Sequence, residues 1–249
     1  MKKIVVFILL SLGLMSPLHA DKIADLEKNF ENIQIAIKKL QVEMELLLLS
    51  GLPYKPGKGI GIINGLIQTT TQHHVGELYQ GGIVFFVDET GQHGLVASKR
   101  DVHQGEGISW RNGESGNRVT NARSDGIGAG ENNTRLIIAQ QTLDANKGKF
   151  AALLASNYHV LSDGETPCPT VFNSSLVCYG NWYLPSAFEL QLLFNNLRQA
   201  NLAAFDPEFY WSSTEVNVTN AWLINFGTGE LIASNKSNTV GRVRAISHF

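Results

Sequence analysis

The sequence predicts a mixed α+β head of short antiparallel strands, about two helices and long loops, preceded by an N-terminal coiled-coil helix. Glycine is abundant, with 24 residues against 7 prolines, which favours a turn-rich domain over a helical bundle. Short apolar runs bounded by turn residues recur through residues 76–249. A heptad repeat lies near the N-terminus. With 43% hydrophobic and 17% charged residues, the chain can form a packed core.

Residues 1–20 have the pattern of a secretory signal peptide. Lys2 and Lys3 supply the positive charge at its start, and residues 4–14 form an apolar run that is short for a membrane span. Cleavage is expected after Ala20, and an uncleaved anchor is the alternative. We therefore expect a secreted, cell-surface or periplasmic protein with no transmembrane segment after signal cleavage.

Residues 21–50 carry an unbroken heptad pattern of apolar side chains. The spacing alternates between three and four residues, which predicts a coiled coil. Isoleucines at both core positions favour three strands over two, so we expect a homotrimer. The alternative is an amphipathic helix that packs on its own domain. The predicted oligomerisation residues are Ile23, Leu26, Phe30, Ile33, Ile37, Leu40, Met44 and Leu47.

Residues 51–75 are interpreted as a neck or linker. Pro53 and Pro56 prevent continuation of the preceding helix, and several glycines follow them. These glycines do not recur at every third position, so the segment is not collagen-like. The neck is also rich in isoleucine, which indicates that it packs between protomers or onto the head rather than acting as a solvated tether.

Residues 76–249 form the predicted head. Strands are expected at 83–87, 94–97, 221–226 and 230–233, at the residues that end in Leu184, and from Tyr210 onward. A helix is expected over 135–150, and residues 151–156 either continue it or start another. Residues 99–133 are expected to form a long irregular region, and such regions often carry function.

A second helix is predicted after Pro185. Ser186 stands at the N-cap and Glu189 follows three residues later, which is the capping-box spacing. The aromatic residues on either side, including Trp182 and Trp211, are interpreted as core rather than as a ligand platform. The helix shows one apolar stripe, made of Leu190, Leu193, Phe194 and Leu197.

The only two cysteines are Cys168 and Cys178. In an exported protein, an even pair of this kind predicts a disulfide bond. Closing so short a loop stabilises a fold by roughly 2–3 kcal/mol in the chain-entropy model. The alternative is a pair of reactive thiols.

Charge and motifs exclude several function classes. The formal net charge is −2, which does not suggest a nucleic-acid-binding protein. No serine-hydrolase, zinc-protease or phosphate-loop signature is present, so we expect no enzyme activity, no cofactor and no metal site. The sugar-binding tripeptides of calcium-dependent lectins are also absent.

Several motifs of the head, taken together, resemble the C-terminal domain family of the Legionella collagen-like adhesin. They occur in the order Tyr-Gln-Gly-Gly-Ile-Val-Phe at 79–85, Gly-Gln-His-Gly-Leu at 91–95, Gly-Ile-Gly-Ala-Gly at 126–130, Trp-Tyr-Leu-Pro-Ser at 182–186, Glu-Leu at 189–190, Tyr-Trp-Ser-Ser-Thr-Glu at 210–215, Ala-Trp at 221–222 and Val-Arg-Ala-Ile at 243–246.

This resemblance implies a C-type-lectin-like fold, related in its core to formylglycine-generating proteins. It also implies a trimer outside the cell that binds sulfated glycosaminoglycans. The chain departs from the family in two respects, of which one is the acidic balance of the head. The other is that a short glycine- and isoleucine-rich neck replaces the collagen-like stalk. The stalk's reach and its collagen-type partners are therefore not carried over.

A polyanionic glycan would require clustered arginines, because the head has more acidic than basic residues. The segment 240–246 alternates polar and apolar residues, which predicts a strand with Arg242 and Arg244 on one face. A trimer would triple this pair, whereas the alternative is that both arginines are salt-bridged. The candidate ligand-binding residues are Arg242, Arg244, Arg100, Arg111, Arg118 and Arg123.

The expected function is that of an exported, trimeric, adhesin-like binding module for sulfated glycans or another host or surface ligand. Two alternatives remain open. One is an enzyme on a formylglycine-generating-like scaffold, which would need Cys168 and Cys178 as free thiols. The other is a structural envelope protein.

Overall fold

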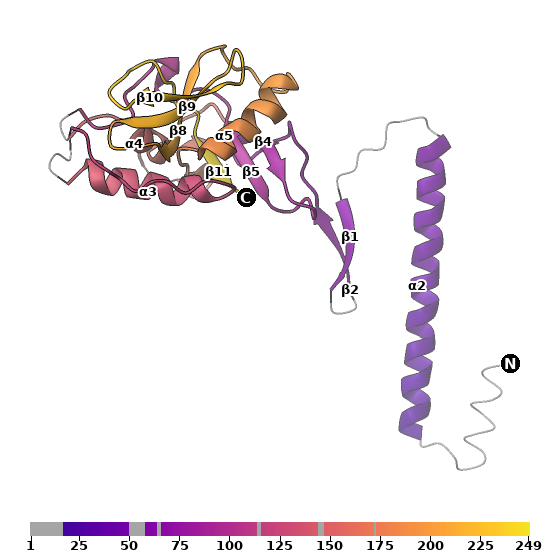
Figure 1. The fold of residues 1–249 in the computed structure, drawn as a ribbon. Helices are drawn as coiled ribbons and strands as arrows, with labels where there is room; N and C mark the ends of the chain where they lie inside the picture. The colour runs from indigo at the N-terminus through magenta and orange to yellow at the C-terminus, as the bar shows by residue number, and fades with distance from the viewer. Residues whose placement is uncertain (1–16, 50–57, 64–65, 114–115, 144–146, 172) are drawn as a thin grey trace. The chain divides into compact units, whose positions relative to one another are not determined.

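The computed structural model describes residues 17–49, 58–63, 66–113, 116–143, 147–171 and 173–249 (Figure 1). The chain divides into two compact units, Met1–Pro56 and Gly57–Phe249. The first contains helix α2 (Pro17–Leu49). Most of the predicted signal peptide lies outside the described residues. The expected cleavage point after Ala20 falls inside α2.

The predicted heptad stripe of α2 is exposed in the single chain. Leu26 is 67% exposed and Phe30 is 62% exposed, and Ile33, Ile37 and Leu40 are exposed as well. The side chains of the other seam residues, at 23, 44 and 47, lie outside the described part. Within that part, no helix combines the length and the apolar character needed to cross a membrane.

Most of the predicted neck is a β-hairpin. Strand β1 (Lys58–Ile63) pairs antiparallel with β2 (Leu66–Thr71). After β2 the buried His73 ring stacks on Tyr79 at 3.9 Å between centroids and meets Phe249 edge-on at 5.0 Å. The end of the neck is therefore packed against the C-terminal residue.

The described part of the head contains two larger antiparallel sheets and one two-stranded sheet, together with helices, so its α+β class is confirmed (Figure 1). The first has the order β11-β5-β4-β3 and includes the predicted hairpin of β4 and β5. Its strands are β3 (Leu78–Tyr79), β4 (Gly82–Val87), β5 (Gly94–Ser98) and β11 (Ile246–His248). The second has the order β10-β9-β8. Its strands are β8 (Phe209–Glu215), β9 (Asn220–Asn225) and β10 (Leu231–Asn235).

A short ladder and the predicted disulfide organise the segment before helix α5 (Ala187–Leu193). Strand β6 (Val160–Leu161) pairs with β7 (Cys178–Tyr179). Cys178 is bonded to Cys168, with Cα atoms 5.7 Å apart. The disulfide prediction is confirmed, and both cysteines of the chain are used in it.

The helix predicted over 135–150 is wrong in its bounds. Helix α3 runs Ala129–Gln141 and α4 runs Ala151–Ser156. Asn133, which lies inside α3, is buried, and its Nδ2 donates to the Ser124 carbonyl (2.7 Å). The remaining helical segments are η1 (His103–Gly105), α5 (Ala187–Leu193) and the π-helical turn η2 (Phe194–Gln199).

The predicted capping box of α5 is confirmed. The Ser186 hydroxyl accepts from Glu189 N (3.2 Å), and Ser186 N donates to Glu189 Oε2 (2.8 Å). The apolar stripe of this helix is buried, and it continues into η2. Local sequence thus fixes the start of α5, as expected for a motif whose partners are three residues apart.

The core prediction for the aromatic residues is confirmed, but two predicted strands are not. Trp182, Trp211 and Tyr183 are at most 2% exposed. The residues before Pro185 form no strand, since Tyr183 makes only an isolated bridge to Ile246. Segment 240–246 is also not a strand, and only its last residue belongs to β11.

Segment 240–246 forms no strand because its residues pair with different parts of the chain. Arg242 bridges Tyr210 in parallel, whereas Val243 bridges Val102 antiparallel. Each residue therefore meets a different neighbour, and no continuous ladder forms. A Cβ on Gly241 would lie 2.4 Å from the Trp211 ring, so glycine is needed at this close approach.

Candidate functional site: a charged cleft

A cleft of about 630 Å³ on the head brings together three of the six predicted arginines. Its cations are Lys99, Arg100, Arg242 and Arg244, and its carboxylates are Asp101, Glu165 and Asp206. They come from the chain after β5, from the turn after β6, and from the segments before β8 and β11. Its volume lies in the range of small-molecule binding sites.

Arg244 is a structural member of this cleft. Its side chain is 3% exposed and its Nη2 lies 2.5 Å from Asp101 Oδ1. The guanidinium also donates to the Ser98 carbonyl (3.0 Å) and lies over the Phe205 ring at 4.2 Å. Because burial and these partners fix the guanidinium, it is poorly placed to exchange partners for a ligand.

Arg242 is more accessible but surrounded by acid. It bonds Asp206 and Asp101, the latter at 3.2 Å, and lies 3.8 Å from Glu208. Burial alone would lower the pKa of Arg242, but the bonds to Asp206 and Asp101 outweigh it and raise the pKa. The salt-bridged alternative therefore describes both arginines. They do share one side, because both bond Asp101.

Asp101 is also bonded by the buried Tyr210. The Tyr210 hydroxyl donates to Asp101 Oδ2 at 3.0 Å. Burial and then the charge of Asp101 raise the pKa of Tyr210 to about 12. The floor of the cleft is thus a fixed polar cluster around one carboxylate.

Lys99 and Arg100 form a different, more open arrangement at the cleft. They share one carboxylate, since Glu165 Oε1 lies 2.6 Å from Lys99 Nζ and Glu165 Oε2 lies 3.3 Å from Arg100 Nη2. The Arg100 side chain is 73% exposed. The bond to Lys99, followed by its charge and that of Arg100, lowers the pKa of Glu165. Glu165 is the carboxylate that bonds both cations, while Asp163 in the same turn interacts with the Lys99 charge.

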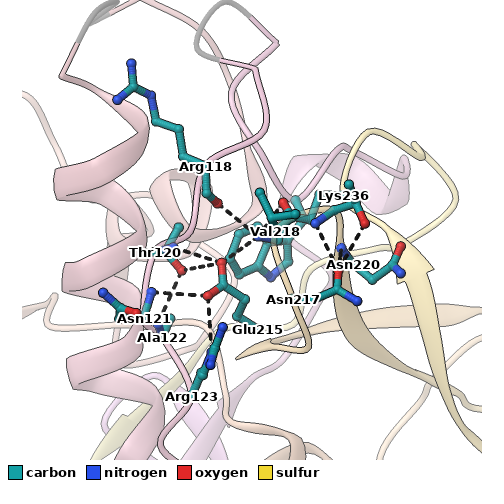
Figure 2. A network of polar contacts seen from close by, with 12 residues as sticks. Arg118, Thr120, Asn121, Ala122, Arg123, Glu215, Asn217, Val218, Asn220 and Lys236 are labelled. Carbon is teal, nitrogen blue, oxygen red and sulfur yellow. Dashed lines mark hydrogen bonds and ion pairs between the residues drawn. The ribbon is translucent and has the colours of Figure 1, made fainter.

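The other three predicted arginines lie outside this cleft, and two of them, Arg118 and Arg123, lie beside a buried network (Figure 2). Arg123 Nε lies 3.6 Å from Glu215 Oε2. Arg118 contributes its backbone carbonyl, which accepts from Lys236 Nζ at 3.2 Å. Arg111 Nη1 donates to the carbonyl of its neighbour Asn112 (3.4 Å). The six arginines therefore do not form one surface.

The centre of this network is an ion pair that the sequence analysis did not predict. Lys236 Nζ lies 2.6 Å from Glu215 Oε1, and neither side chain is exposed. Glu215 also accepts from Thr120 N (2.8 Å) and Asn121 N (3.1 Å), as Figure 2 shows. Lys236 lies 4.6 Å from the Trp110 ring centroid. The pair ties the 99–133 region to the end of the second sheet.

A smaller pocket of about 340 Å³ lies beside the disulfide and is lined by His248 and Glu131. The Tyr183 hydroxyl lies 3.0 Å from His248 Nε2 and donates to the buried Glu189 at 3.3 Å. Burial raises the pKa of Glu189, and bonds from the Ser186 and Gly128 backbones oppose this. Glu189 caps α5, so this chain of groups supports the fold.

Sequence reasoning missed the residues that complete the charged cleft, namely Lys99, Asp101, Glu165 and Asp206. One signal was present, because Lys99 directly precedes the predicted Arg100. The carboxylates carry no such signal, since their partners are distant in the sequence. Among the described residues, no group of three histidine, cysteine, aspartate or glutamate side chains could hold a metal ion.

No protein-family model matches the chain, and no curated protein matches it significantly.

Proposed function

We propose that this protein is an exported, trimeric binding module whose head recognises sulfated glycans at the charged cleft. The observation that carries the proposal is the pairing of Lys99 and Arg100 with a single carboxylate, Glu165. The exposed Arg100 guanidinium presents planar donors that match a sulfate group. Arg242 and Arg244, whose charges are matched by neighbouring acids, shape the cleft rather than bind the anion.

The proposed trimer rests on α2. An exposed apolar stripe with strict heptad spacing is unfavourable in water and is covered when copies of the helix associate. Three heads carried on one coiled coil would engage a polymeric glycan at several points. Such multivalent binding multiplies the affinity of each weak site through effective concentration.

The C-type-lectin-like fold and the adhesin role belong to the same proposal. They rest on the ordered motifs between residues 79 and 246 and on the two antiparallel sheets with long connecting loops. Export rests on the pattern of residues 1–20. The enzyme alternative loses its proposed nucleophiles, because the only two cysteines of the chain are bonded to each other. A structural envelope protein remains the second candidate function. The heparin experiment below distinguishes it from a glycan-binding module.

The test is retention of the mature protein on immobilised heparin at two salt concentrations. The wild type is expected to be retained and to elute as salt rises, because the contact is electrostatic. The double variant Lys99→Ala/Arg100→Ala is expected to elute earlier. Arg135→Ala is the control, since it removes an exposed arginine of α3 that pairs with Glu131 outside the cleft. No retention of the wild type would contradict the proposal and favour a structural role.

A further inference from the structure

Glu165 occupies the place in the cleft that an anionic ligand group would take. Its two carboxylate oxygens are divided between two cations, with Oε1 at 2.6 Å from Lys99 Nζ and Oε2 at 3.3 Å from Arg100 Nη2. A carboxylate bridging two adjacent cations has the same charge sign and acceptor geometry as one edge of a sulfate. The chain thus supplies its own anion to this subsite.

A defined turn presents Glu165 to the two cations. Asp163 Oδ1 accepts from Glu165 N (3.0 Å) and Thr166 N (2.9 Å). Gly164, at φ +71°, lies so close to the chain that an added Cβ would be 2.8 Å from the Gly81 carbonyl oxygen. The same Cβ would lie 3.3 Å from the Lys99 side chain. The turn therefore packs against Lys99.

The turn is anchored independently of the Glu165 side chain. Leu161 N donates to the Thr166 carbonyl at 2.9 Å, which closes the turn at its base. Just after it, Cys168 is bonded to Cys178, whose strand β7 pairs with Leu161 of β6. Because these contacts hold the backbone, the Glu165 carboxylate can leave Lys99 and Arg100 by side-chain rotation alone.

We propose that Glu165 is an intramolecular competitor at an anion subsite formed by Lys99 and Arg100, and that a ligand sulfate binds there by displacing it. This inference rests on the proposed function, and it identifies the contact that sets the affinity of the cleft for a sulfate group. The Glu165 side chain is 43% exposed and that of Arg100 is 73% exposed, so the ion pair is a surface pair. Surface pairs are weak, so a local concentration of sulfates can replace this one.

The competitor makes the subsite selective for dense negative charge. An isolated anion must compete with a carboxylate that the chain tethers next to the two cations. A sulfated polymer presents many anions at once. The free energy needed to displace Glu165 is therefore offset by its contacts with the neighbouring heads. Removing the competitor is therefore expected to strengthen binding about two- to fivefold, the range that weak surface pairs allow.

The experiment compares the mature wild type with Glu165→Gln and with Glu230→Gln. The control removes the same charge from an exposed carboxylate in the turn between β9 and β10, outside the cleft. Two readouts are taken. The first is the NaCl concentration that elutes each protein from heparin. The second is acetylation of Lys99, followed by mass spectrometry, in the presence of increasing sucrose octasulfate.

The expected result is that Glu165→Gln elutes at higher salt than both other proteins. Its Lys99 is also expected to be protected at an octasulfate concentration about two- to fivefold lower than in the wild type. Equal elution of Glu165→Gln and Glu230→Gln, with unchanged protection of Lys99, would overturn the inference. If heparin retains none of the proteins but octasulfate still protects Lys99 better in Glu165→Gln, the glycan proposal fails and the competing carboxylate stands.

Discussion

Lys236 and Glu215 form an ion pair inside the head, with Nζ and Oε1 2.6 Å apart and neither side chain exposed. The lysine also donates to the carbonyls of Arg118 and Val218, each at 3.2 Å. The carboxylate accepts from Thr120 and Asn121, so the charges and polar groups of the pair are matched. The pair joins the long irregular region to the second sheet.

Replacing Lys236 with methionine is expected to destabilise the head strongly. The variant leaves the buried Glu215 carboxylate without its cation, which typically costs about 3–5 kcal/mol. Denaturant unfolding of the purified variant measures the loss. The control is Lys149→Met, which removes an exposed lysine. A loss no larger than that of the control would show that the pair does not hold this region.

The same pair predicts a dependence of stability on acid. Burial tends to raise the pKa of Glu215, but the bonds from Lys236 and Thr120 lower it below its ordinary value. A carboxyl group with a lowered pKa in the folded state stabilises the fold above its unfolded pKa and loses that contribution as the pH falls. The melting temperatures of wild type and Glu215→Gln should differ most near neutral pH and converge below about pH 4. A constant difference would contradict this assignment.

Gly130 is expected to tolerate no side chain, although it lies inside helix α3. Alanine normally stabilises a helix relative to glycine by roughly 1 kcal/mol. Here, however, a Cβ would lie 2.5 Å from Glu189 Oε2 and 2.7 Å from the Leu184 carbonyl oxygen. Gly130→Ala should therefore lower the melting temperature. The control is Gly113→Ala, where the added Cβ meets no atom of the described residues within 4 Å. Equal melting temperatures for the two variants would sink this prediction.

The exposed stripe of α2 predicts an effect on assembly without an effect on the head. Ile33→Asp places a charge in the centre of the heptad seam, where a trimer would have to bury it. Light scattering should give three times the chain mass for the wild type and a smaller mass for the variant. Melting of the head should be unchanged. A monomeric wild type would remove the trimer and its multivalency from the proposal.

How far the sequence predicted the molecule depends on the range of each interaction. The capping box of Ser186 and Glu189 was predicted because its partners are three residues apart. The β4–β5 hairpin was predicted because a short turn joins its two apolar runs, and the disulfide because the chain has only two cysteines. The bounds of α3 were missed because its N-terminus has no side-chain cap of its own. The N–H groups of Gly128 and Gly130 donate instead to Glu189, which is 61 residues from Gly128. The 240–246 segment alternates like a strand but bridges two separate neighbours.

The candidate site was harder to predict than the fold. Arg242 and Arg244 were predicted to lie on one side, and both bond Asp101. That both arginines are salt-bridged was left as an alternative, because the partner carboxylate is distant in the sequence. Asp101 is 141 residues from Arg242. No local pattern connects Glu165 to Lys99. Only the folded chain brings these charges together.

The most direct test of the account is calorimetric titration of the mature protein with a heparin oligosaccharide and with its desulfated counterpart, at low and high salt. A sulfate-binding cleft predicts binding of the sulfated form that weakens as salt rises, no measurable binding of the desulfated form, and a clear loss of affinity in Lys99→Ala/Arg100→Ala. Equal binding of the two oligosaccharides, or an affinity unchanged in the double variant, would contradict it.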